Sequence, residues 1–127
     1  MSALRVRREP APDGLFLVRG DDLAAETLRR DAIRTYRRFG EYGVSVLGAW
    51  TEADIDELAG GLLRRFEVLT VMTAGALRQS GIELRPTFRR PHFTVMLPDL
   101  DADIFRLLRC ENERRVNDHY RPEEVQP

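Results

Sequence analysis

Basic, hydroxyl and imidazole side chains are concentrated in residues 86–98, just before and within an apolar stretch. His92 and Thr94 are two residues apart, so both project to the same face if this stretch is a strand. An imidazole and a hydroxyl on one face could exchange a proton with a single phosphate oxygen. Arg89 and Arg90 precede them, and guanidinium groups bind phosphate through paired hydrogen bonds. We therefore predict an anion site here, with a structural hydrogen-bonding role for His92 as the alternative.

Two prolines stiffen the connection that carries these arginines. Pro86 and Pro91 stand on either side of Arg89 and Arg90, and a stiff loop binds an anion with a smaller loss of conformational entropy. Phe88 offers a second interpretation, because burial of its ring in the core would leave both arginines in solvent.

The unit His92-Phe93-Thr94 resembles half of the signature of the two-histidine phosphoesterases. In that family a His-x-Thr or His-x-Ser unit occurs twice, and the two histidines flank the scissile phosphate. This sequence has only one such unit, because its other histidine, His119, is followed by Tyr120 and Arg121 in a polar tail.

A second candidate group begins with Arg19, at the end of a buried apolar run, and continues with Ser45 on the next predicted strand. Their order resembles the opening layout of the small ADP-ribosyltransferase-like toxins. In those proteins a first-strand arginine contacts the dinucleotide, a serine supports the nicotinamide pocket and a downstream glutamate is catalytic. The resemblance implies NAD as substrate and leaves Glu83 as the nearest carboxylate, although no Glu-x-Glu or Gln-x-Glu occurs. The alternative for Arg19 is a salt bridge to one of the nearby acids, Asp21, Asp22 or Glu67.

Composition narrows the functional classes. The net charge of −1 argues against a sequence-independent DNA coat, although all 20 basic residues are arginine. Cys110 is the only cysteine, so an intrachain disulfide is excluded and a metal site would need other ligands; we predict none. Residues 1–10 are charged where a signal peptide is apolar, which favours a cytoplasmic location. Signatures of serine nucleophiles, phosphate-binding loops and dinucleotide sites are missing.

Apolar periodicity predicts alternating strands and helices. The predicted strands are 15–18, 44–47, 66–72 and 93–97, with brief ones at 4–7 and 82–84, and the predicted helices are 21–39, 51–60, 74–79 and 99–115. Asp21 or Asp22 would cap the first helix, Thr51 the second and Thr73 the third. We expect a single domain over residues 1–127, α+β or α/β, with one mixed sheet of about four to six strands and three to four flanking helices. Residues 117–127 would form a frayed acidic tail.

The first predicted helix carries a group of arginines on its polar side, Arg30, Arg34, Arg37 and Arg38. Such a group is typical of a solvated helix face, and the alternative is a surface for nucleic acid or an acidic partner.

The chain as a whole is similar to the toxin halves of small bacterial toxin–antitoxin pairs. That resemblance implies an enzyme that acts on a nucleotide or nucleic acid, by ADP-ribosyl transfer or phosphodiester chemistry, and a protein partner that is antitoxin-like or a second copy. The candidate catalytic residues are His92, Arg19 and Glu83, and the candidate substrate-binding residues are Ser45, Arg89, Arg90 and Thr94, gathered at one sheet edge. The alternative function is a non-catalytic interaction module that binds a protein partner or itself.

Overall fold

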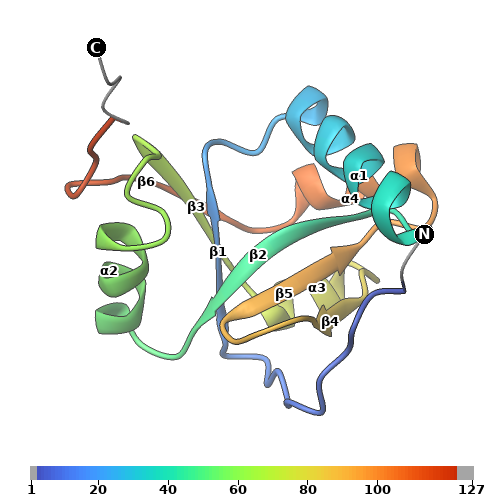
Figure 1. Cartoon of the computed structure of the whole chain (residues 1–127), viewed down its shortest axis with the longest axis horizontal. Helices are drawn as coiled ribbons and strands as arrows, with labels where there is room; N and C mark the ends of the chain where they lie inside the picture. The colour runs from blue at the N-terminus through green and yellow to red at the C-terminus, as the bar shows by residue number, and fades with distance from the viewer. Residues whose placement is uncertain (1–2, 123–127) are drawn as a thin grey trace.

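Apolar runs form the four central strands of one six-stranded sheet in this computed structural model, which describes residues 3–122 (Figure 1). The strands are β1 (Phe16–Gly20), β2 (Gly43–Ala49), β3 (Val68–Thr73), β4 (Leu84–Pro86), β5 (His92–Met96) and β6 (Glu113–Val116). Their order is β4-β5-β2-β1-β3-β6, and every neighbouring pair is antiparallel. The fold is therefore α+β, one of the two classes that the sequence predicted. The sheet is antiparallel, whereas a mixed sheet was expected.

Four helices flank this sheet, and local capping explains where two of them begin. The helices are α1 (Ala25–Phe39), α2 (Glu52–Gly60), α3 (Ala74–Gln79) and α4 (Leu100–Arg109). Thr51 and Thr73 each accept a hydrogen bond from a main-chain N–H in the first turn, as predicted. Helix α1 instead follows Ala24, whose methyl side chain cannot cap it, and Asp22, two residues earlier, pairs with Arg114. Among residues 3–122, no helix has the length and apolar character needed to cross a membrane.

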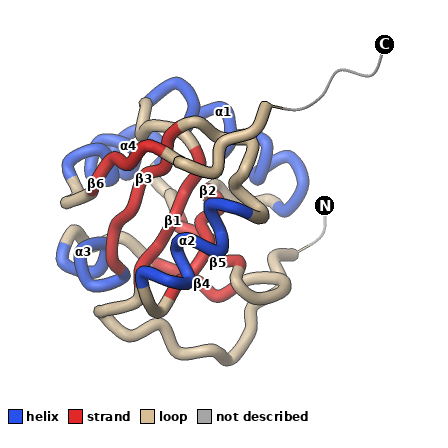
Figure 2. Tube along the Cα trace, turned by 90° about the vertical axis from the view of Figure 1, so that its left-hand side faces the viewer, coloured by secondary structure: helices blue, strands red, loops and turns tan. Residues whose placement is uncertain are grey.

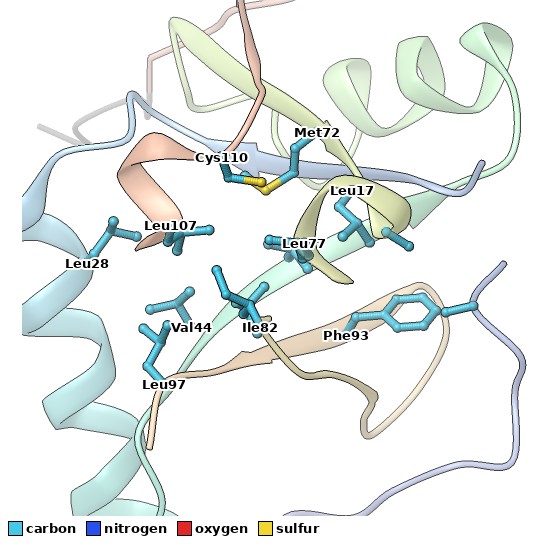
Figure 3. Close-up of a cluster of buried hydrophobic side chains, with 14 of the residues drawn as sticks. Leu17, Leu28, Val44, Met72, Leu77, Ile82, Phe93, Leu97, Leu107 and Cys110 are labelled. Carbon is cyan, nitrogen blue, oxygen red and sulfur yellow. The ribbon is translucent and has the colours of Figure 1, made fainter. Parts of the chain in front are cut away.

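The two faces of the sheet bury separate apolar clusters. Adjacent residues on β1 point to opposite faces, so Leu17 enters one cluster and Val18 the other. The larger cluster is covered by α1, α3 and α4, whose residues Leu28, Leu77 and Leu107 meet over the strands (Figure 3). Helix α2 covers the opposite face and lies across the strands in Figure 2. Each fully buried leucine contributes about 1.5–3 kcal/mol, which makes these clusters the main source of stability.

The region after Arg109 differs from its sequence prediction. A helix was expected over residues 99–115, but α4 ends at Arg109 and residues 113–116 form β6. The apolar stripe of α4 stops at Cys110, so a longer helix would bury nothing further. Strand β6 instead pairs with β3, which supplies hydrogen-bond partners to a strand that would otherwise be a sheet edge.

Asn117 holds the segment after β6 against α2. Its side chain is buried, and Nδ2 donates to the carbonyls of Ala59, Leu63 and Phe66 at 3.0–3.1 Å. These carbonyls belong to the end of α2 and the connection that follows it, where helical partners run out. The predicted frayed tail over residues 117–127 therefore does not begin at 117, while residues 123–127 lie outside the described part of the chain.

Candidate active site

A cavity of about 710 Å³ opens over the part of the sheet that α2 leaves uncovered. Ser45 and Leu47 of β2, with His92 and Thr94 of β5, form its floor. One wall is the polar flank of α1, and the other is the connection from α2 to β3. This volume is typical of small-molecule sites. The cavity lies over β1, β2 and β5, which are inner strands of the sheet. The sequence had suggested a site at the sheet edge, and the structure corrects that placement.

Three side chains of the floor and the buried Thr87 form a continuous chain of hydrogen bonds. Ser45 Oγ lies 2.9 Å from His92 Nε2, and His92 Nδ1 lies 2.7 Å from Thr87 Oγ1. Thr87 Oγ1 also lies 2.7 Å from Thr94 Oγ1. The register of β2 and β5 makes this contact, because it sets Ser45 opposite Thr94 and therefore diagonal to His92. A serine, a histidine base and an orienting hydroxyl thus stand in the order that nucleophilic catalysis requires.

The surroundings of His92 favour the neutral ring. Burial lowers its pKa below the ordinary 6.5, a main-chain hydrogen bond to Thr87 acts in the opposite direction, and the positive charge of Arg7 lowers it further. Arg7 also donates to the carbonyl oxygens of Thr87 and His92, at 2.8 Å for the latter, and so ties both ends of the loop together. The Phe88 ring packs against the imidazole with centroids 5.1 Å apart. At neutral pH His92 is therefore able to act as a base.

Arg19 is buried beside the serine. Its side chain is 9% exposed, pairs with Asp31 of α1, and donates from Nη1 to the main-chain carbonyl of Ser45 at 3.0 Å. Its buried Nε has no hydrogen-bond partner among the described residues. A buried donor without a partner is uncommon in folded proteins and occurs at functional sites. The guanidinium thus places a fixed positive charge next to Ser45.

The rest of the lining combines positive charge with aromatic rings. Three arginines of α1 and one of the α2–β3 connection line the cavity together with Arg19, namely Arg30, Arg34, Arg38 and Arg65. Among the described residues, the only acids in the lining are Asp21 and Asp31. Three phenylalanines also line it, Phe39, Phe66 and Phe88, and two of them lie beneath guanidinium groups at 4.9–5.3 Å. Guanidinium groups bind phosphate and aromatic faces stack on bases, so this lining suits a nucleotide.

The structure brings together only part of the predicted site. Arg19, Ser45, His92 and Thr94 all line the cavity, whereas Glu83, Arg89 and Arg90 do not.

Glu83 is exposed near the outer strand β4 and pairs with Arg85. Arg90 pairs with Glu9, at 3.2 Å, and lines a second hollow of about 440 Å³. Arg89 is exposed, while Phe88 packs against Phe39 and His92. Both arginines are exposed, as the second interpretation of this loop expected, but Phe88 is only half-buried at the cavity and belongs to neither core cluster.

Sequence reasoning missed two residues that complete the site, Thr87 and Arg7. Thr87 stands five positions before His92, a spacing that has no meaning for a strand or a helix, and only the turn between β4 and β5 brings the two side chains together. Arg7 reaches the same turn from the N-terminal segment, where Val6 forms an isolated bridge with Thr87. The alternating residues 4–7 had predicted an edge strand, and this bridge is what the structure has there.

Within residues 3–122, no group of three or more His, Cys, Asp or Glu side chains is placed to hold a metal ion. Comparison with protein-family models, curated proteins and solved structures finds no match to this chain. The function must therefore be argued from the cavity itself.

Proposed function

We propose that this protein is an enzyme that acts on a nucleotide or nucleic acid by phosphate-ester chemistry in the cavity that Arg19 and His92 line. The observation that carries the proposal is the hydrogen bond between His92, whose pKa burial lowers, and Ser45 on the floor of a cavity lined by five arginines. His92 would transfer the proton. The arginines would bind the phosphate and stabilise the negative charge that grows on its oxygens in the transition state.

Phosphodiester chemistry is better supported than ADP-ribosyl transfer. Arg19 and Ser45 are neighbours, as the ADP-ribosyltransferase resemblance implies. Glu83, the proposed catalytic carboxylate of that reaction, is outside the cavity. Asp31 lines the cavity but is already paired with Arg19. NAD is therefore the substrate of the less favoured reaction, and RNA or a nucleotide is the substrate of the favoured one.

A toxin-like role follows from this chemistry, because destruction of RNA or nucleotides stops growth. The first test is induction of the wild-type gene in a heterologous bacterial host, beside Arg19→Met and His92→Ala versions that are shown to be folded and equally expressed. We expect arrest by the wild type and relief by both substitutions. Arrest that neither substitution relieves would show that the cavity is not the source of toxicity.

The second test uses purified protein with a labelled single-stranded RNA and, separately, with NAD. We expect cleaved RNA and unchanged NAD, with Arg34→Gln at least tenfold slower than wild type because Arg34 lines the cavity. Arg37→Gln is the matched control, since Arg37 lies on the same helix but is not part of the lining. Equal losses for the two variants would mean that net charge alone, and not the cavity, governs the reaction. Turnover of NAD in place of RNA would favour ADP-ribosyl transfer.

Binding of a protein partner is the second candidate function, and one feature favours it. Trp50 and Leu62 are 54% and 64% exposed, and both line the second hollow. Large exposed apolar side chains, tryptophan above all, are enriched in protein interfaces. Light scattering of the purified protein tests self-association: a dimer that Trp50→Ser dissociates would support this function, and a monomer at all concentrations would exclude a second copy as the partner.

A further inference from the structure

We propose that Ser45 is a nucleophile that forms a covalent bond to phosphorus, with His92 as its base and Thr87 as the residue that positions the base. This inference rests on the proposed phosphate chemistry for its natural substrate. It concerns a step that the phosphate-binding lining does not by itself require, because a histidine can also activate water directly.

Access and proximity both single out Ser45. Its side chain is exposed to the cavity from the middle of β2, whereas Thr94 and Thr87 are buried and their hydroxyls are hydrogen-bonded to each other. Ser45 Oγ is 2.9 Å from His92 Nε2, within the range expected for a nucleophile and its base. Strand β5 pairs with β2 at Ser45, and on the β1 side Arg19 donates to the Ser45 carbonyl, so the hydroxyl is held on a rigid element.

The hydrogen-bond chain gives the base the required tautomer. The proposal assigns the ring proton to Nδ1, which donates to Thr87 Oγ1, and the Thr87 hydroxyl then donates to Thr94 Oγ1. Nε2 is left with its lone pair directed at the Ser45 hydroxyl. Thr87 thus takes the part that an acid takes in other serine–histidine sites, namely fixing the ring and its tautomer. Thr87 is a positioning residue, since it acts only through His92.

Arg19 supplies the charge that the reaction needs. Nη1 of Arg19 donates to the main-chain carbonyl of Ser45, and both residues line the same cavity, so we place its guanidinium near a phosphate that binds at Ser45. Two phosphate oxygens gain negative charge as the bond to Ser45 forms, and a fixed cation at that point stabilises them.

The reaction takes two steps, with a phosphoserine ester between them. Ser45 Oγ attacks phosphorus while its proton passes to His92 Nε2, and the bond from phosphorus to the leaving oxygen breaks as that oxygen takes the proton from His92. The product is a phosphoserine ester. Water then attacks phosphorus and gives a proton to His92, the Ser45 Oγ–phosphorus bond breaks, and Oγ recovers the proton, which restores the enzyme.

A fluorophosphonate probe tests the nucleophile without knowledge of the natural substrate. Serine Oγ displaces fluoride from such a probe and stays phosphonylated, and mass spectrometry of the digested protein locates the adduct. We expect a single adduct on Ser45, at least a hundredfold slower labelling of His92→Ala, and none on Ser45→Ala. An adduct on Ser80, or no adduct at millimolar probe, would overturn the proposal.

Two substitutions at Thr87 separate positioning from packing. Thr87→Val keeps the volume and removes the hydroxyl, while Thr87→Ser keeps the hydroxyl and loses a methyl group. We expect labelling of Ser45 to slow about tenfold or more in Thr87→Val and to return near the wild-type rate in Thr87→Ser, with both variants folded by circular dichroism. Equal labelling of the two variants would contradict a role for the hydroxyl.

Failure of this inference can be told apart from failure of the proposed function. Cleavage of RNA by a protein whose Ser45 takes up no probe, or whose Ser45→Ala variant keeps full activity, would remove the nucleophile and keep the phosphate chemistry. Labelling of Ser45 by a protein that processes no nucleotide or RNA would support the nucleophile and refute the nucleotide substrate.

Discussion

Removal of either partner of the Arg19–Asp31 ion pair should have very different effects on stability. Arg19 is 9% exposed, and Asp31 is its only carboxylate partner among residues 3–122. Asp31 is 25% exposed and has two further cations nearby, Arg30 at 3.8 Å and Arg34 at 3.9 Å. Loss of Asp31 therefore leaves the buried charge of Arg19 without a carboxylate partner, whereas loss of Arg19 leaves a carboxylate that has other partners and access to water.

The magnitudes follow from this asymmetry. Breaking a fully buried pair by removing one partner costs about 3–5 kcal/mol. Water reaches Asp31, and alanine favours the helix by a few tenths of a kcal/mol, so we expect about 2 kcal/mol for Asp31→Ala. For a chain of this length that corresponds to a Tm lower by about 7 °C. Arg19→Met replaces a buried charge by an apolar side chain of similar length, and we expect a change within about 1 kcal/mol in either direction.

Urea unfolding of the two single variants and of the double variant measures the asymmetry. In the Arg19→Met background, Asp31→Ala should lower the free energy of unfolding by less than about 0.5 kcal/mol, because no buried charge is then left without a partner. A loss for Arg19→Met that equals or exceeds the loss for Asp31→Ala would refute the reasoning. Arg19 would then be required for the fold, and its burial would no longer indicate a function.

Three further outcomes are expected. Because burial lowers the pKa of His92, the unfolded chain binds a proton at a higher pH than the folded protein does, so the free energy of unfolding should fall as pH decreases below about 6.5. Urea midpoints measured from pH 8 to pH 5 should therefore depend less on pH in His92→Asn than in the wild type. The same pH dependence in both proteins would contradict this. Asn117→Ala should cost about 1–3 kcal/mol, because three carbonyls lose their donor, while His119→Ala, whose partner Asp56 is exposed, should cost less than about 1 kcal/mol; equal urea midpoints for the two variants would be the contrary result. Burial also raises the pKa of Cys110, so iodoacetamide should modify the native protein far more slowly than the unfolded one; comparable rates would show that the thiol is accessible.

Local patterns were sufficient to predict most of the fold. The threonine caps of α2 and α3 and the apolar runs of β2 and β5 depend on residues within a few positions of each other, and all of them are present. Strand β6 was missed because its residues are polar and it forms only by pairing with β3, which is distant in sequence.

The candidate site was predictable to the extent that it follows strand alternation. His92 and Thr94 share a face because they are two residues apart, and the cavity confirms that placement. Chain order alone points to Glu83, and order does not determine that a side chain just before β4 faces the cavity. Thr87 joins His92 through a turn whose geometry depends on Phe88 at φ 58° and on Arg7, and no sequence period encodes such a contact.

The most direct test of the central claim is where a nucleotide binds. We would titrate isotope-labelled protein with a nucleoside monophosphate and follow its amide and arginine Nε–H resonances by NMR. The account predicts that the largest shifts fall on Arg19, Ser45 and His92, and that Arg34→Gln weakens binding while Arg37→Gln does not. Shifts centred on Trp50 and the second hollow, or no shifts at millimolar nucleotide, would contradict it.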